Sequence, residues 1–246
     1  MTAPTSRADF DLPPHVWRGR ELASVQEQVV STGHASLDAQ LPGGGWPLGN
    51  LVEVLQKDAG QHVWQLVGPA LASALQRQAD PAVLVHPPYQ PFGPALRDAG
   101  IPPERLLCVH ADKVSARLWA AEQALRCGEV AAVLAWLPQA RTEDLRRLQL
   151  CAQSGDKLLL VFRHADARGH SSPARVRVLV QGSEELELTI LKRRGPPLLQ
   201  PLVLSAQPKK LSALLAARKA RRSIAPAEIP STPSHVLDRT ATLAGG

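Results

Sequence analysis

The stretch from Ser31 to Leu66 contains the residues whose spacing comes closest to a chemical site, a phosphate-binding loop. An apolar strand is expected over 51–55, and a helix is expected to begin near His62 after a short polar loop. In such a unit the backbone N–H groups and the helix N-terminus hold phosphates, and the lysine of GxxxxGK[ST] reaches the terminal phosphates. The layout therefore predicts a phosphate loop, and its residue types decide whether the loop can work.

Those residue types lack the groups that nucleotide chemistry needs. Where the motif ends in Gly-Lys-Ser/Thr, the chain has Gly60, Gln61 and His62. Leu55 stands at the position of the first glycine. Without the lysine there is no point charge for the terminal phosphates, and without the hydroxyl there is no ligand for Mg²⁺. The strand expected over 130–137 also ends without a metal-binding aspartate. We therefore expect a degenerate loop, no cofactor and no ATPase activity.

The elements that must position this loop alternate between apolar strands and helices, which is typical of a parallel sheet covered by helices. Strands are expected over 51–55, 82–86, 106–110, 130–137 and 158–162, and helices over 63–78, 92–99, 114–126 and 142–154. Thr142 is the expected N-cap of the last helix. Beyond these elements, runs over 174–180 and 186–191 predict an antiparallel hairpin, with an edge strand over 202–204. A short helix is expected over 21–30.

Several short motifs resemble those of RecA-type recombinases and, more specifically, of the ImuA family of bacterial mutagenesis cassettes. The matching residues are Ser31, Thr32, Gly33, Leu37, Asp38, Gly44, Gly45, Pro47, Gly49 and Glu53, together with the segments 17–19, 41–47, 172–174 and 191–196. This resemblance implies a RecA-like (P-loop NTPase-type) α/β fold, with a mostly parallel sheet flanked by helices and an antiparallel C-terminal hairpin. In RecA relatives a glutamate after the second strand activates water, and the matching segment 85–88 has none.

The resemblance to ImuA implies a non-catalytic accessory factor in SOS-type DNA damage tolerance, that is, in translesion synthesis and induced mutagenesis. The implied partners are a Y-family-like (ImuB-like) polymerase partner, an error-prone replicative-type polymerase and the RecA recombinase. One alternative is a cell-division inhibitor like SulA, which has a similar shell without a phosphate loop and binds the tubulin-like division protein. SulA-like proteins are shorter and lack a long basic C-terminus. A second alternative is a nucleotide-dependent enzyme with an unusual loop.

The chain is interpreted as an N-terminal extension (1–30), a RecA-like core (31–206) and a basic helix with a C-terminal tail (207–246). Trp17 and Arg18 are candidate anchors for a partner, because buried Trp and Arg dominate interface energies. The plainer interpretation is that Trp17 packs on its own domain. Further candidate contacts to DNA or a partner are Lys192, Arg193, Arg194, Lys209, Lys210, Arg218, Lys219, Arg221 and Arg222. Each of these basic clusters is equally compatible with a solvated face.

Composition limits the remaining function classes. The formal net charge of +6 and the pI near 9.6 favour acidic partners, including DNA. No apolar run approaches the ~20 residues that span a bilayer. We therefore expect no membrane partner, and we expect a cytoplasmic location. Cys108, Cys127 and Cys151 fit neither a zinc site nor a disulfide framework, and free, buried thiols are expected. The histidines form no metal-binding spacing.

Overall fold

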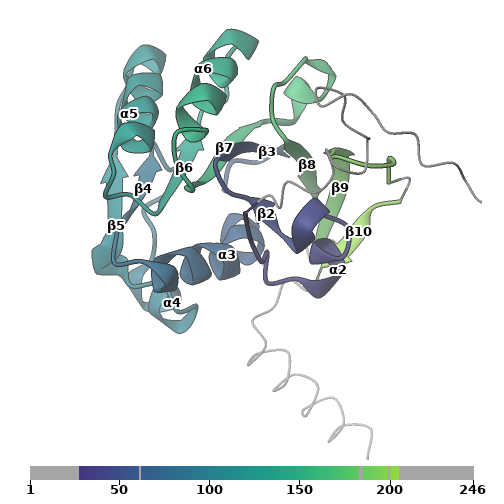
Figure 1. Ribbon diagram of the computed structural model, residues 1–246, viewed down its shortest axis with the longest axis horizontal. Helices are drawn as coiled ribbons and strands as arrows, with labels where there is room; N and C mark the ends of the chain where they lie inside the picture. The colour runs from purple at the N-terminus through teal and green to yellow at the C-terminus, as the bar shows by residue number, and fades with distance from the viewer. Residues whose placement is uncertain (1–27, 61, 183–184, 199, 205–246) are drawn as a thin grey trace, which may run out of the picture. The chain divides into compact units, whose positions relative to one another are not determined.

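The computed structural model describes residues 28–60, 62–182, 185–198 and 200–204. These residues form an eight-stranded sheet in the order β10-β9-β8-β3-β7-β6-β4-β5, beside a small two-stranded sheet, β1-β2 (Figure 1). Strands β8, β3, β7, β6, β4 and β5 run parallel, whereas β9 and β10 continue the sheet antiparallel. The predicted α/β class, the mostly parallel sheet and the C-terminal hairpin are therefore confirmed.

The elements of the structure have the following bounds. The strands of the large sheet are β3 (Asn50–Gln56), β4 (Ala82–Val85), β5 (Leu106–Val109), β6 (Ala132–Trp136), β7 (Leu158–His164), β8 (Val176–Gln181), β9 (Leu186–Lys192) and β10 (Leu202–Leu204), and the small sheet has β1 (Val29–Val30) and β2 (Trp46–Pro47). The α-helices are α2 (Ala35–Asp38), α3 (Val63–Arg77), α4 (Gly93–Asp98), α5 (Val114–Arg126) and α6 (Thr142–Ala152). Three short 3-10 turns are η1 (Pro42–Gly44), η2 (Pro103–Arg105) and η3 (Ala165–Gly169).

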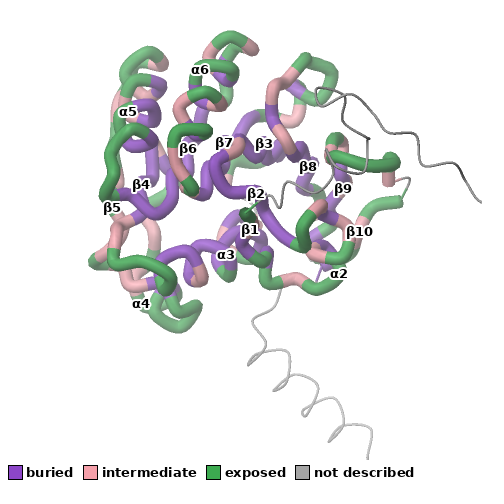
Figure 2. The backbone as a smooth tube through the Cα atoms, viewed as in Figure 1, coloured by how far each residue is buried: buried purple, intermediate pink, exposed green. Residues whose placement is uncertain are grey.

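Helices cover the sheet on both faces. Helices α5 and α6 lie on one face, and α3 and α4 lie on the other (Figure 1). The central strands are apolar on both sides because each face is covered, and β6 is buried along its whole length (Figure 2). This two-sided burial leaves the carboxyl ends of the parallel strands as the edge where polar side chains can meet.

Helix α3 continues through Pro69, although a proline removes a helical hydrogen bond. The carbonyl that loses its partner belongs to Gln65, four residues earlier, and it lies 2.9 Å from Nε2 of His34. A protonated Nε2 therefore replaces the missing backbone donor. Gly33 permits this approach, since a Cβ there would lie 2.3 Å from Cβ of Pro69. The sequence favours a kink or a restart of this helix near Gly68 and Pro69, and in the structure α3 is a single helix that contains both residues.

The motif before the loop is a turn held by one aspartate. Oδ1 of Asp38 accepts the backbone N–H of Thr32 at 2.8 Å, and Oδ2 accepts the hydroxyl of Ser31 at 2.6 Å. Leu37 beside it is fully buried and belongs to the larger hydrophobic core cluster. The spacing of Ser31, Thr32 and Asp38 therefore has a structural explanation, which is the placement of Leu37 in the core.

Two local predictions are wrong. The helix expected over 21–30 does not reach its last residues, because Val29–Val30 is a strand that pairs with Trp46–Pro47. Thr142 is the first residue of α6 and not its N-cap, which is Arg141. The backbone N–H of Arg141 donates to Oδ2 of Asp144 at 2.9 Å, and the Thr142 hydroxyl donates instead to the carbonyl of Ser171. The Thr142 hydroxyl therefore makes a tertiary contact and does not cap the helix.

Candidate functional site

A buried leucine stands near the end of β3, just before the loop that leads to α3. Leu55 packs with Ala167 and Leu179, so its side chain fills a small core beneath η3 and β8. A phosphate loop needs glycine at such a position so that its backbone can approach the phosphates. The Leu55 side chain instead packs in the core, and this packing fixes the position of the backbone at Leu55.

The far end of the loop is held by contacts within the chain. His62, the N-cap of α3, has a left-handed φ of 53°. Its Nε2 lies 3.0 Å from the carbonyl of Gly182 in the β8–β9 connection, so the ring nitrogen donates. Gly60 packs under Tyr89, because a Cβ there would lie 2.8 Å from the ring. Gln61 lies outside the described residues. The end of the loop is therefore fastened to the hairpin and to the segment after β4.

A cavity of about 240 Å³ opens at the carboxyl ends of β3, β4, β6 and β7, and we call it the basic chamber. Its wall includes Lys57, His86, Arg117, Trp136, Arg163 and His164. Ligands of open parallel sheets bind at this edge of the strands. Lys57 forms no ion pair with another described residue, and the Arg117 guanidinium donates to the backbone carbonyls of Ala111 and Asp112. This chamber therefore carries positive charge that no wall carboxylate offsets.

A second cavity of about 280 Å³ adjoins the first, and we call it the apolar chamber. Its wall includes Trp64, Tyr89, Phe92, Leu96, Ile101 and Trp136. Trp136 and Pro88 border both chambers. The Trp136 ring stacks on Phe162 at a centroid distance of 4.5 Å, at the strand end where the sequence lacks an acid. The position at which an ATPase would need a metal ligand is therefore an aromatic wall.

His86, directly after β4, is held in an unusual conformation. Its φ is 54°, a value that non-glycine residues rarely adopt, and its backbone N–H donates to the carbonyl of Val109 at 2.7 Å. Burial is the main reason that the pKa of His86 lies below its ordinary value, and the positive charge of Arg117 and the neighbouring His110 lower it further. The ring is therefore biased toward its neutral form in the wall of the basic chamber.

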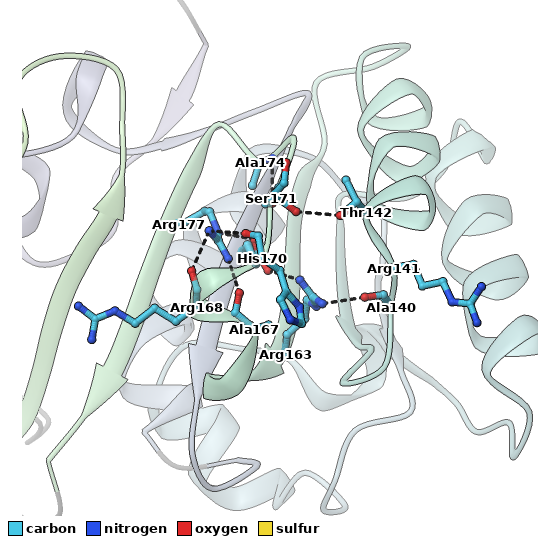
Figure 3. A network of polar contacts seen from close by, with 12 residues as sticks. Ala140, Arg141, Thr142, Arg163, Ala167, Arg168, His170, Ser171, Ala174 and Arg177 are labelled. Atoms are coloured by element: carbon cyan, nitrogen blue, oxygen red, sulfur yellow. Dashed lines mark hydrogen bonds and ion pairs between the residues drawn. The ribbon is translucent and has the colours of Figure 1, made fainter.

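On the other side of Arg163 lies a buried ion-pair centre (Figure 3). Glu53 of β3 is fully buried and accepts from Nη1 of Arg163 at 2.7 Å and from Nε of Arg177 at 2.6 Å. Both arginines are also nearly buried. Buried charges are tolerated when they are paired and hydrogen-bonded, and this carboxylate uses both oxygens. We call Glu53, Arg163 and Arg177 the ion-pair centre.

The ion-pair centre fixes the segment 165–172. Arg177 donates from Nη2 to the carbonyl of Ala167 at 2.9 Å and from Nη1 to that of His170 at 3.1 Å (Figure 3). Lys192 and Thr142 donate to the next carbonyls, those of Ser172 and Ser171. Cationic and hydroxyl donors from three elements therefore hold the backbone of this segment.

The predicted basic cluster 192–194 is only partly available to a partner. Lys192 donates to Ser172, and its pKa is lowered, first by burial and then by the charge of Arg177. The Arg193 guanidinium donates to the carbonyls of Pro196 and Gln40. Arg194 is exposed. The structure thus brings these three residues together at the end of β9, where Lys192 and Arg193 donate to backbone carbonyls of their own chain.

The other predicted contacts lie outside the described residues. These are Trp17, Arg18, Lys209, Lys210, Arg218, Lys219, Arg221 and Arg222. The three cysteines are free, as expected, but Cys127 is exposed and the other two are half-buried, which corrects their predicted burial. Burial raises the pKa of Cys108. The described residues contain no group of His, Cys, Asp and Glu suited to a metal ion, and none of their helices is long and apolar enough to cross a bilayer.

Sequence reasoning missed the ion-pair centre and both chambers. A signal for the first was present, because Glu53, Arg163 and Arg177 each interrupt an apolar strand of the core. A charge within a strand that is buried on both faces needs a buried partner of opposite sign. No comparable signal marks the chambers, since their walls come from segments that only the strand order brings together.

Comparison with known proteins finds two related groups. A sequence model of the family "Cell division inhibitor SulA" matches residues 49–158, from the start of β3 to the start of β7. SulA of Edwardsiella piscicida is 25% identical over 138 residues, which are 56% of this chain and 82% of that protein. SulA of Photorhabdus laumondii subsp. laumondii is 32% identical over 82 residues, covering 33% of this chain and 46% of that protein.

ImuA of Caulobacter vibrioides is 34% identical over 164 residues, which are 63% of this chain and 64% of that protein, in each of two strains. The chain therefore spans a little less than two thirds of the length of these relatives. The match is longer than either SulA match. The resemblance to ImuA that the motifs indicated is thus confirmed, and the chain is similar to ImuA and, over its central part, to SulA.

Proposed function

We propose that this protein is a non-catalytic accessory factor in SOS-type DNA damage tolerance that acts by docking to other proteins. Similarity to ImuA supports a role in damage-induced mutagenesis. The proposed partners are a Y-family-like (ImuB-like) polymerase partner, an error-prone replicative-type polymerase and the RecA recombinase. DNA is a further candidate ligand, at the cluster 192–194.

The observation that carries the proposal is the loop between β3 and α3. The unit keeps its strand–loop–helix layout, but Leu55 belongs to the core and His62 is bonded to the hairpin. A nucleotide loop must leave its backbone N–H groups free to close around phosphates. Because Leu55 and His62 are held by contacts within the chain, the unit favours a protein that binds partners through its surface. It does not favour a protein whose conformation is switched by a nucleotide.

The strand order supports a RecA-like core as part of this proposal. Strand β3, which leads into the loop, is separated from β6 by β7, and β8 continues the sheet on its other side. A core of this kind keeps the surfaces through which recombinases assemble head to tail. We infer that the protein meets a RecA protomer or filament end through one such surface.

Copurification with separate partners tests the docking role. We expect the tagged full chain to retain purified RecA and the polymerase partner. Trp17→Ala should lose RecA, and a truncation after Ala206 should lose the polymerase. Trp119→Ala is the matched control, because Trp119 is an exposed tryptophan on α5. Retention of neither protein by the intact chain would reject the proposed function.

The absence of catalysis is tested by phosphate release. We expect no Mg²⁺-dependent ATP hydrolysis above that of a heat-inactivated sample. Gln61→Lys should not restore hydrolysis, because the metal and water ligands are missing as well. Measurable release by the wild-type protein would show that the loop is a working site.

A second candidate function is division inhibition, and the match of the SulA family model over 49–158 supports it. The longer ImuA match favours mutagenesis. Retention of the tubulin-like division protein, with no retention of RecA or the polymerase, would reverse this preference.

A further inference from the structure

The two chambers form one composite site with an uneven chemistry. Both lie at the carboxyl ends of the parallel strands, and they share Pro88 and Trp136 as walls. The apolar chamber has no charged side chain in its wall, whereas the basic chamber has Lys57 and Arg117 and no carboxylate. A single ligand that enters both therefore needs an apolar part next to an acidic part.

The apolar surface extends beyond the cavity onto the outside of the molecule. Tyr89 is 72% exposed and Phe92 is 69% exposed, although both also line the apolar chamber. Exposed aromatic side chains beside a cavity are typical of a surface that another protein covers. A small molecule held inside the cavity would leave these rings in water, whereas a peptide segment would cover them.

The charge of the basic chamber is not neutralised by its surroundings. Arg163 is matched by Glu53, but Arg117 donates only to backbone carbonyls, and Lys57 forms no ion pair within the described chain. Three carboxylates lie beside wall residues without lining the chamber: Asp58 is exposed next to Lys57, Asp166 contacts His164, and Asp112 acts on His86. An incoming carboxylate would therefore meet a surplus of positive charge.

Buried polar atoms without partners belong to the same wall. Among the described residues, Oε1 of Gln56, Nδ1 of His86, Nε1 of Trp136 and Nε of Arg163 have no hydrogen-bond partner. All four residues line the basic chamber. An unsatisfied buried polar atom costs about 1–3 kcal/mol, and most buried polar atoms in native proteins have a partner in the protein or in water. Four of the seven such atoms among the described residues belong to residues of this wall, so the wall is polar as well as positively charged.

We propose that the two chambers bind a segment of a partner protein in which an aromatic or aliphatic side chain stands beside an acidic one. The apolar side chain enters between Tyr89, Phe92 and Trp136, and the carboxylate pairs with Lys57 and Arg117. This site specifies the kind of contact behind the docking function proposed above, and in that sense it rests on that function.

Capped tetrapeptides test the site directly. The probe is acetyl-Ser-Phe-Glu-Ser-amide, and its controls replace Phe by Ala or Glu by Gln. In an NMR titration of the full chain we expect saturable shifts of the amides over 57–60 and 86–92. The Gln peptide should bind about fivefold more weakly, the size of one partly exposed charge pair, and the difference should shrink as salt rises.

Variants locate each half of the ligand. Lys57→Gln should reduce the preference for Glu over Gln, of which Arg117 keeps a part, and Phe92→Ser should reduce the preference for Phe over Ala. Arg146→Gln and Leu150→Ser are matched controls, since both residues are exposed on α6. Lys57 makes no contact that folding needs, so circular dichroism of its variant should be unchanged.

Four outcomes would overturn the proposal. Equal binding of the Glu and Gln peptides would remove the role of charge, and an unchanged preference in Lys57→Gln would move the site elsewhere. Binding of 3-phenylpropionate as tight as that of the peptide would make the occupant a small molecule. Peptide binding without retention of RecA or polymerase would reject only those partners, whereas retention unaffected by Lys57→Gln and Phe92→Ser together would reject only this site.

Discussion

Arg163 lies between two regions, the ion-pair centre and the basic chamber, and cationic side chains have different surroundings in each. Toward β8, Arg163 and Arg177 share the buried carboxylate of Glu53, and Nη2 of each arginine donates to a backbone carbonyl. Toward β4, Lys57 and Arg117 line a chamber without a carboxylate. One region has its charges satisfied internally, and the other leaves positive charge facing a cavity.

This difference indicates that the charges of the two regions have different roles. In the ion-pair centre a carboxylate with two guanidinium groups positions a segment of backbone, so the charges act on the fold. In the basic chamber Lys57 is exposed and forms no ion pair with another described residue, and Arg117 donates only to the carbonyls of Ala111 and Asp112, so neither charge meets an internal carboxylate. Charge without an internal partner therefore marks the region where an external partner is to be sought.

The largest expected effect comes from breaking the ion-pair centre. Glu53→Gln leaves two buried arginines without a counter-charge, and we expect a loss of about 3–5 kcal/mol in the free energy of unfolding. The matched control is Glu122→Gln, because Glu122 is also buried but pairs with Arg147, whose side chain is 61% exposed. That change should cost about 1 kcal/mol or less.

Urea unfolding of the two variants measures the difference. If both lost the same amount, the buried pairing would not distinguish the ion-pair centre from an ordinary helix–helix contact. A wild-type stability for Glu53→Gln would mean that water or another group replaces the carboxylate.

The next effect concerns the segment 165–172. Arg177→Met removes the donors to Ala167 and His170 while keeping an unbranched apolar stem, and we expect a loss of about 2 kcal/mol. Hydrogen exchange should speed up over 165–172 more than in β6. Thr142→Val, which removes only the bond to Ser171, is the control and should cost about 1 kcal/mol or less. Uniform exchange across the core would show that Arg177 does not hold this segment in particular.

The sequence was informative where the pattern is local. Continuous apolar runs and helical periodicity predicted strands β3 to β9 and the four long helical segments within a few residues, because each such element is encoded by neighbours along the chain. The short strands β1 and β2 were not predicted, since two residues have no periodicity of their own. They are stabilised by pairing with each other.

The candidate site was much less predictable for a physical reason. Glu53 meets its arginines across 110 and 124 residues, so their pairing depends on which strands become neighbours. Helix α3 shows the same limit, because the donor that compensates Pro69 comes from His34 in a separate turn. Leu55 and His62 were singled out by residue type, but their contacts with Leu179 and Gly182 could not be derived from the motif.

A smaller effect tests the basic chamber through its histidine. The folded pKa of His86 lies below 6.5 because of burial, Arg117 and His110, while Asp112 acts in the opposite direction. The unfolded chain therefore binds this proton more readily, so the stabilisation is complete above about pH 6.5 and is lost as the pH falls through the folded pKa. His86→Asn removes the titration and keeps a residue that tolerates positive φ.

Stability of the two proteins between pH 7 and pH 5 measures this contribution. We expect the wild-type protein to lose more stability than His86→Asn over that range. His170→Asn is the control, since His170 is exposed. We expect this variant to lose as much stability between pH 7 and pH 5 as the wild-type protein. Parallel pH profiles for His86→Asn and the wild type would show that the chamber does not suppress protonation of His86.

The smallest expected effect compares the cations of the two regions as DNA ligands. If the chain binds single-stranded DNA as proposed, each phosphate contact contributes about −0.7 to the slope of log K against log salt concentration. Lys192→Ala with Arg194→Ala should flatten the slope by roughly 1.4, because two contacts are removed. Lys192 is exposed and uses one of its three donors on Ser172, whereas Arg193→Ala should change the slope little, since the carbonyls of Gln40 and Pro196 already occupy its guanidinium. Lys57→Ala with Arg117→Ala should leave the slope unchanged, because their chamber is suited to a single acidic group and not to a phosphate chain. A flatter slope for this second pair than for the first would assign DNA to the basic chamber and reverse the division between the two regions.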